Sequence, residues 1–211
     1  LEECRAMNDE RHAADKLYHL GTVMWSDCRN REAIEYHEQA VAICERLGLT
    51  DLVAVQAYHG RGEAHFTNLE LAAAIACYQR SIELARGIGD RSYESENLMM
   101  IAFAHTGSMG LGDYAKAQTS FESALEIAEH ADLQWHMGPT LVGLDHVRAC
   151  TGRYGEAWRG MNKTLRLLES LRQTRYQLIA YNFMGHLLLD LGLAESAVEC
   201  SQRALAVTRD A

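Results

Sequence analysis

The chain has 211 residues, of which 48% are hydrophobic and 23% are charged. This composition is that of a folded protein with a packed core, and it excludes a disordered, collagenous or coiled-coil chain. Pro139 is the only proline and the 16 glycines are scattered, so few positions interrupt a helix. An all-α fold is therefore favoured.

The net charge of −9 is unevenly distributed, because residues 1–140 carry −11 and residues 141–211 carry +2. An acidic surface repels phosphate backbones and anionic lipid headgroups, so we expect neither a nucleic-acid nor a membrane partner. No apolar run reaches the roughly 18 residues that a membrane span needs. Basic or apolar protein segments fit this surface better. The last third has one basic stretch, which is either a solvated helix face or a docking patch for an acidic neighbour: Arg153, Arg159, Lys163, Arg166, Arg172 and Arg175.

The six cysteines and ten histidines indicate neither a disulfide framework nor a metal site. No cysteine pair has CxxC spacing, so we expect reduced, structural thiols in a cytoplasmic protein. His146 and His186 occupy equivalent places in adjacent copies of the repeat described below. Packed helices lie about 10 Å apart, which is marginal for shared chelation. We expect no metal and no cofactor.

Catalysis is also not expected. Cys150 follows His146 by four residues on one predicted helix, and this is the only pair that resembles a nucleophile with its base. Such neighbours arise easily by chance on a helix. The sequence therefore predicts no catalytic residue and no enzyme activity for this chain.

A motif of small and apolar residues recurs along the chain. It centres on Ala33, Ala74, Ala117, Ala157 and Ala197, which are separated by 41, 43, 40 and 40 residues. A small or short side chain follows seven residues after each alanine and an aliphatic one eight residues after it, which places all three on one helical face. Twelve residues before the alanine stands Gly21, Gly62, Asp145 or Gly185, and in the third copy the equivalent is Ala102, displaced by a short insertion.

These spacings predict antiparallel helical hairpins. A small residue on the first helix, such as Gly21, and one on the second, such as Ala33, would let the two backbones approach closely. Gly48 and Gly89 are expected to end the second helix of two copies. One hairpin cannot bury its apolar face alone, so the copies are expected to stack into a solenoid.

The repeated segments, such as HLGTVMWSDCRNREAIEYHEQAVAIC and MGHLLLDLGLAESAVECSQRALAV, resemble the tetratricopeptide repeat. The usual period of that family is about 34 residues. The longer period here is similar to that of Pins/LGN-like arrays and of repeat regions in bacterial cyclase- or ATPase-type signalling regulators. The resemblance implies an all-α fold, a right-handed superhelical solenoid of antiparallel helical hairpins. It implies a single domain over 1–211, with a tail of a preceding repeat at 1–9 and five repeats at 10–50, 51–90, 91–131, 132–170 and 171–211.

Several positions depart from the pattern. About three extra residues near Ser108–Gly110 predict a widened hairpin loop rather than a phosphate-binding loop, since no strand precedes it and no Lys-Ser or Lys-Thr follows. Asp145 stands where a small residue is expected, so it needs a partner such as Arg148 or a basic residue of the next helix, unless the crossing is loose or the carboxylate has a functional role.

We also expect the chain to be a fragment of a larger signalling protein. Its last hairpin is expected to expose an apolar face that pairs two copies end to end.

In the resembling family the first helices of successive repeats line a concave groove that binds partner segments. Carried over position by position, the groove residues are Asp15, Tyr18, Thr22, Trp25, Gln56, His59, Glu63, Phe66, Glu96, Met99, Phe103, Val142, His146, Asn182 and His186. The family's clamp for a C-terminal carboxylate uses basic residues and asparagine, whereas Asp15, Glu63 and Glu96 stand here.

The sequence therefore predicts a protein-interaction module that binds a basic or amphipathic segment of another protein or of another domain of the parent chain. The alternative is a ligand-sensing regulatory domain that controls an attached catalytic domain, such as a nucleotide cyclase or an ATPase. A closed pocket around His59, Phe103 and His146 would favour this alternative.

Overall fold

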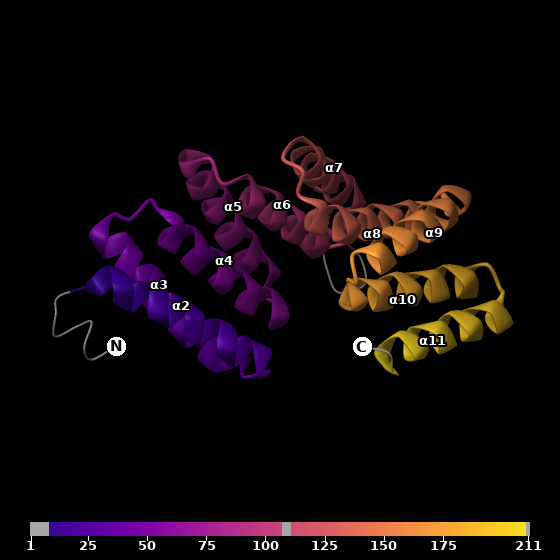
Figure 1. The fold of residues 1–211 in the computed structure, drawn as a ribbon, viewed down its shortest axis with the longest axis horizontal. Coiled ribbons are helices and arrows are strands. Elements are labelled where there is room, and N and C mark those ends of the chain that lie inside the picture. The colour runs from indigo at the N-terminus through magenta and orange to yellow at the C-terminus, as the bar shows by residue number, and fades with distance from the viewer. Residues whose placement is uncertain (1–8, 107–110, 210–211) are drawn as a thin grey trace. The chain divides into compact units, whose positions relative to one another are not determined.

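The computed structural model describes residues 9–106 and 111–209, and within these ranges every regular element is an α-helix (Figure 1). The helices are α2 (Glu10–Ser26), α3 (Asn30–Leu47), α4 (Leu52–Thr67), α5 (Leu71–Ile88), α6 (Arg91–His105), α7 (Tyr114–His130), α8 (Gln134–Cys150), α9 (Tyr154–Ser170), α10 (Thr174–Asp190) and α11 (Ala194–Arg209). The predicted all-α repeat fold is confirmed. The predicted tail of a preceding repeat at 1–9, apart from Asp9, and the extra residues at 108–110 lie outside the described residues.

The helices form two compact units, Leu1–Asp113 and Tyr114–Ala211. Unit 1 contains α2–α6 and unit 2 contains α7–α11. Within each unit consecutive helices pack against each other, and the first helices of successive pairs are also in contact, α2 with α4, α4 with α6, and α8 with α10. The five repeat boundaries and the single domain stay predictions.

The ends of several helices follow from capping chemistry. The side chains of Asp9, Asp51 and Asp90 accept hydrogen bonds from backbone N–H groups in the first turns of α2, α4 and α6. Gly48 and Gly89 have φ angles of 63° and 75°, a left-handed conformation that glycine adopts without a Cβ clash. The prediction that these two glycines end α3 and α5 is confirmed.

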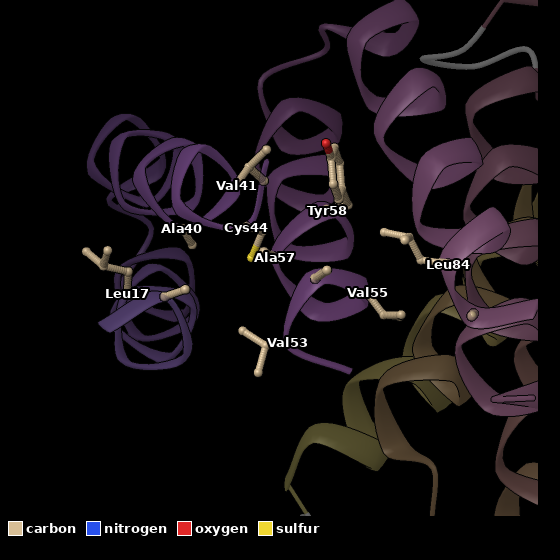
Figure 2. Packing of buried hydrophobic residues seen from close by; sticks show 12 residues of the cluster. Leu17, Ala40, Val41, Cys44, Val53, Val55, Ala57, Tyr58 and Leu84 are labelled. Carbon is tan, nitrogen blue, oxygen red and sulfur yellow. The ribbon is translucent and has the colours of Figure 1, made fainter. Parts of the chain in front are cut away.

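The core of unit 1 is built mainly from small and aliphatic side chains where α2, α3 and α4 meet, and it extends to α5 (Figure 2). Leu17, Val41 and Val55 are almost completely buried there. A corresponding cluster in unit 2 joins α8, α9, α10 and α11 around Met161 and Leu168.

The glycines of the repeat pack against other side chains than the prediction gave. A Cβ added to Gly21 would lie 2.6 Å from the ring of His37, and one added to Gly62 would lie 2.6 Å from the ring of Tyr78. The glycines therefore make room for a large ring placed four residues after Ala33 and Ala74, rather than for the alanines themselves. At Gly185 the nearest atom would be 3.9 Å away, so that position does not require glycine.

This packing predicts opposite results for two glycine-to-alanine changes. A Cβ on Gly143 would lie 2.1 Å from Cζ of the fully buried Phe121, so Gly143→Ala is expected to destabilise unit 2 by about 1–3 kcal/mol. The matched change Gly185→Ala has space in α10 and is expected to stabilise it by up to about 1 kcal/mol through helix propensity. Urea unfolding followed by circular dichroism measures both. A Gly143→Ala variant as stable as Gly185→Ala would contradict this packing.

Candidate functional site

The face formed by the first helices of unit 1, α2, α4 and α6, carries eleven of the predicted groove residues. Nine of them are half-buried, with part of each side chain reaching solvent: Asp15, Tyr18, Thr22, Trp25, Gln56, Glu63, Phe66, Glu96 and Phe103. His59 and Met99 are buried, with exposed fractions of 9% and 3%. This face is called the unit 1 first-helix face below.

A polar cluster ties the three helices of this face together. The Tyr93 side chain on α6 interacts with the side chains of Gln56 of α4 and Tyr18 of α2. Burial, and next the neighbouring Tyr18, raises the pKa of Tyr93 above its ordinary value. The groove residues expected from the sequence did not include Tyr93, although Tyr93 lies three residues before Glu96 and so shares its helix face.

A second set of hydrogen bonds fixes His59 beneath this face. Its Nδ1 lies 2.9 Å from Oδ1 of Asn97, whose side-chain amide donates to Oγ of Ser81 at 3.0 Å. Ser81 in turn donates to the backbone carbonyl of Val55 at 2.9 Å. Asn97, which the sequence analysis also missed, is fully buried. These bonds join α4, α5 and α6, and they hold the His59 ring in the interior of unit 1.

The acidic and aromatic side chains of the face have defined positions. The Tyr78 hydroxyl donates to Oε1 of Glu63 at 2.6 Å, and the indole N–H of Trp25 donates to Oγ1 of Thr67 at 2.8 Å. The Thr67 hydroxyl donates to the backbone carbonyl of Glu63 one turn earlier on α4, so Trp25 is held beside the turn that carries Glu63. Asp15 lies 3.7 Å from Nε2 of His19. The face can thus offer carboxylates beside apolar rings to a cationic segment.

In unit 2 the predicted residues divide into buried and exposed ones. Val142 is fully buried in the core, and His146, 9% exposed, stacks on Phe183 with ring centroids 3.8 Å apart. Asn182 and His186 are exposed and line a cavity of about 750 Å³ on α10 and α11. Leu189, Val198 and Leu205 in the same lining are each more than half exposed. The predicted exposed apolar face of the last hairpin is confirmed, and end-to-end pairing of two copies stays a prediction.

Cys150 lies close to His146, the base that the sequence pattern pairs with it. Its Sγ lies 3.6 Å from Nε2 of His146, and its side chain interacts with that of Tyr114. Burial, and next His186, lowers the pKa of His146 to about 4. A base that weak takes a proton poorly from a thiol. The other described cysteines, Cys28, Cys44, Cys77 and Cys200, are free thiols as well.

Asp145 is satisfied inside unit 2, with an exposed fraction of 1%. Nη1 of Arg148 donates to its Oδ1 at 2.6 Å, and the Thr164 hydroxyl donates to its Oδ2 at 3.2 Å. Gly160 leaves the space for the carboxylate, because a Cβ there would lie 2.0 Å from Oδ1. Burial raises the pKa of Asp145 above its ordinary value, against the opposing effects of Arg148 and Thr164. Of the partners expected from the sequence, Arg148 is the one used.

Within residues 9–106 and 111–209, no group of three or more histidine, cysteine, aspartate or glutamate side chains could hold a metal ion. None of the described helices combines the length and apolar character needed to cross a bilayer.

Comparison with known proteins gives consistent results. One tetratricopeptide repeat model matches residues 12–87, and a second matches residues 102–130 and 178–210. No curated protein matches the sequence. The fold is similar to a Rap protein complexed with competence and sporulation factor, with a TM-score of 0.73, 17% identity, and coverage of 99% of this chain and 67% of that one.

Two further structures are similar. For apo RapI the TM-score is 0.75 and the identity 15%, with coverage of 99% and 87% of the two chains. For the TPR-like repeats of a putative kinesin light chain from Podosopora anserina the TM-score is 0.70 and the identity 15%, with coverage of 95% and 96%. These likenesses show the fold alone. With the two models together spanning more than half of its length, the chain belongs to the tetratricopeptide repeat family.

Proposed function

We propose that the chain is a protein–protein interaction module that binds a basic or amphipathic segment along the unit 1 first-helix face. The observation that carries this proposal is the set of three carboxylates on that face, Asp15, Glu63 and Glu96. Among the described residues none of the three forms an ion pair with lysine or arginine. An incoming lysine or arginine side chain would supply the missing cation through charge-assisted hydrogen bonds.

Apolar side chains beside these carboxylates supply the anchor points. Trp25, Phe66 and Phe103 are each half-buried, so part of each ring is held by the protein while part stays open. The bond from Trp25 to Thr67 and the cluster around Tyr93 fix this face before a partner arrives. A preorganised surface loses less conformational entropy on binding. The partner is therefore an amphipathic segment with apolar and cationic side chains, and a free C-terminal carboxylate is disfavoured.

The proposal also covers the cellular environment of the module and the larger protein that it serves. The similar Rap structure contains competence and sporulation factor, which supports binding of a partner molecule by this fold. Cys28 and Cys150 are exposed free thiols, which supports a reducing, cytoplasmic environment. The module would serve a larger signalling or regulatory protein.

The ligand-sensing alternative has less support from the geometry. The pocket expected for this alternative requires solvent-accessible side chains at His59, Phe103 and His146. His59 is hydrogen-bonded to Asn97 and His146 is stacked on Phe183, and both rings are at least nine-tenths buried. These two rings stabilise their own units, and the interaction module remains the proposed function.

Fluorescence anisotropy with two labelled synthetic peptides tests this proposal. A peptide that alternates leucine with lysine is expected to bind, and its analogue with glutamate in place of lysine is expected not to compete with it. The double variant Asp15→Lys/Glu96→Lys reverses two carboxylates of the face and is expected to weaken binding at least about tenfold, which corresponds to about 1.4 kcal/mol.

The matched control is Glu38→Lys/Glu126→Lys, which makes the same change of net charge at exposed positions on the second helices α3 and α7. Binding within about twofold of the parent chain is expected for this control. An equal loss in both double variants would show that net charge alone attracts the peptide, and competition by the glutamate peptide would show that the face does not select cations. Either result would refute the proposed face.

A further inference from the structure

Unit 2 contains a cavity of about 520 Å³ whose walls come from α9, α10 and α11 and the turn between α10 and α11. Large apolar side chains line it while remaining open to solvent. Tyr154 and Trp158 are 38% and 40% exposed, and Leu191 and Leu193 are 47% and 50% exposed. Its volume is that of pockets that hold a small ligand or a bulky side chain.

Two of the lining residues, Trp158 and Leu193, depart from the repeat pattern. Leu193 stands four residues before Ala197, and the same place in the four earlier copies holds a charged residue: Arg29, Glu70, Asp113 and Arg153. Trp158 follows Ala157, whereas the residue after the central alanine elsewhere is isoleucine, glutamine or valine. A gathering of exposed apolar side chains in one hollow is typical of an interaction site.

One cation lines the cavity, and three more lie on α9, the helix that forms one of its walls. Arg203 of α11 lines it, and Arg159, Lys163 and Arg166 form an i, i+4, i+7 stripe along an exposed face of α9. In the described part of the chain, none of these four side chains forms an ion pair with a carboxylate. Glu199 is the single carboxylate among the lining residues. Arg203 and the α9 stripe are therefore available to an acidic partner.

We infer that this cavity and the α9 stripe form a docking site for an acidic peptide segment that carries a bulky apolar side chain. The apolar side chain enters between Trp158 and Leu193, and the acids of the segment pair with Arg203 and with the stripe. Tryptophan, tyrosine and arginine are the residues that contribute most to binding at protein interfaces. The stripe extends about 10 Å along the helix at 1.5 Å per residue, so a segment fits it better than a small carboxylate.

This site is independent of the proposed function, because it uses other helices and selects the opposite charge. The unit 1 first-helix face presents carboxylates to a cationic segment, whereas the cavity presents cations to an anionic one. A double variant on that face, Asp15→Lys/Glu96→Lys, is therefore expected to leave binding at the cavity unchanged within about twofold.

The test uses fluorescence anisotropy on the full chain with a labelled synthetic peptide that has one phenylalanine among glutamates. Saturable binding that weakens with added salt is expected. The analogue with lysine in place of glutamate is expected not to compete for it. Trp158→Ala is expected to weaken binding at least about tenfold, as is Lys163→Glu/Arg203→Glu.

Matched controls separate the site from general effects on unit 2. Trp135→Ala removes another exposed tryptophan of the same unit, 62% exposed on α8, and is expected to leave binding unchanged. Arg31→Glu/Arg172→Glu makes the same change of net charge at exposed positions outside the cavity. Circular dichroism establishes that each variant is folded. Absence of saturable binding, competition by the lysine peptide, or an equal loss in Trp135→Ala would each overturn the proposal.

Discussion

Unit 1 is expected to lose stability as the pH falls from about 6.5 towards 4, because His37 is buried in its neutral form. The ring is 1% exposed, fills the space beside Gly21 and Gly60, and has no hydrogen-bond partner at Nδ1. Burial, and next the neighbouring His59, lowers the pKa of His37 from 6.5 to about 4. The unfolded chain then binds a proton that the folded chain does not, so stability decreases with acidification in this window. The full loss is about 3 kcal/mol.

His37→Phe tests this expectation without opening a cavity. Phe121 of unit 2 fits against Gly143 in the corresponding place, so a phenylalanine ring suits this packing and removes both the titration and the unpaired Nδ1. Urea unfolding at pH 7 and pH 5, followed by the fluorescence of Trp25 after Trp135→Phe and Trp158→Phe, reports on unit 1. The pH dependence is expected to shrink in His37→Phe and to persist in the control His19→Gln, whose ring is 63% exposed. An unchanged pH dependence in His37→Phe would refute the role of His37.

The helical hairpins could be predicted from the sequence because each copy independently carries the same pattern of small and apolar residues. The side chain that packs against each glycine from the opposite helix could not be predicted from the sequence. Gly21 and Gly62 face the rings of His37 and Tyr78 rather than an alanine, because the ring from the next turn fills the space that the glycine leaves. A spacing pattern specifies which residues share a face, but it does not specify which side chain of the opposite helix fills a given gap.

The candidate site could be predicted in part for the same reason. The repeat pattern identified the half-buried acids and aromatics of α2, α4 and α6, but it also included Met99 and Val142, which are buried. It omitted Tyr93, whose interactions with two other helices depend on tertiary geometry. The cavity beside Trp158 had one available signal in the sequence, namely the apolar Leu193 at a position that is charged in every earlier copy.

Removal of the Arg148 guanidinium is expected to destabilise unit 2 by about 3 kcal/mol at pH 7. Asp145 is 1% exposed, and Arg148 lies 2.6 Å from its Oδ1, so Arg148→Met leaves a buried carboxylate with only Thr164 as a side-chain donor. Breaking such a pair costs about 3–5 kcal/mol, and the lower value applies because the Arg148 side chain is 32% exposed and screened by solvent.

A double-mutant cycle with Asp145→Asn distinguishes an uncompensated charge from lost packing of the arginine. Asparagine keeps the shape and the bond from Thr164 without the charge, so Asp145→Asn/Arg148→Met is expected to recover most of the stability lost in Arg148→Met. Because the folded-state pKa of Asp145 is raised, the deficit of Arg148→Met should also shrink as the pH falls through that pKa and the carboxylate takes up a proton. Urea unfolding followed by circular dichroism at pH 7 and pH 5 measures both effects. If the double variant is as unstable as Arg148→Met and the deficit is independent of pH, then Arg148 stabilises unit 2 through its packing rather than through its charge on Asp145.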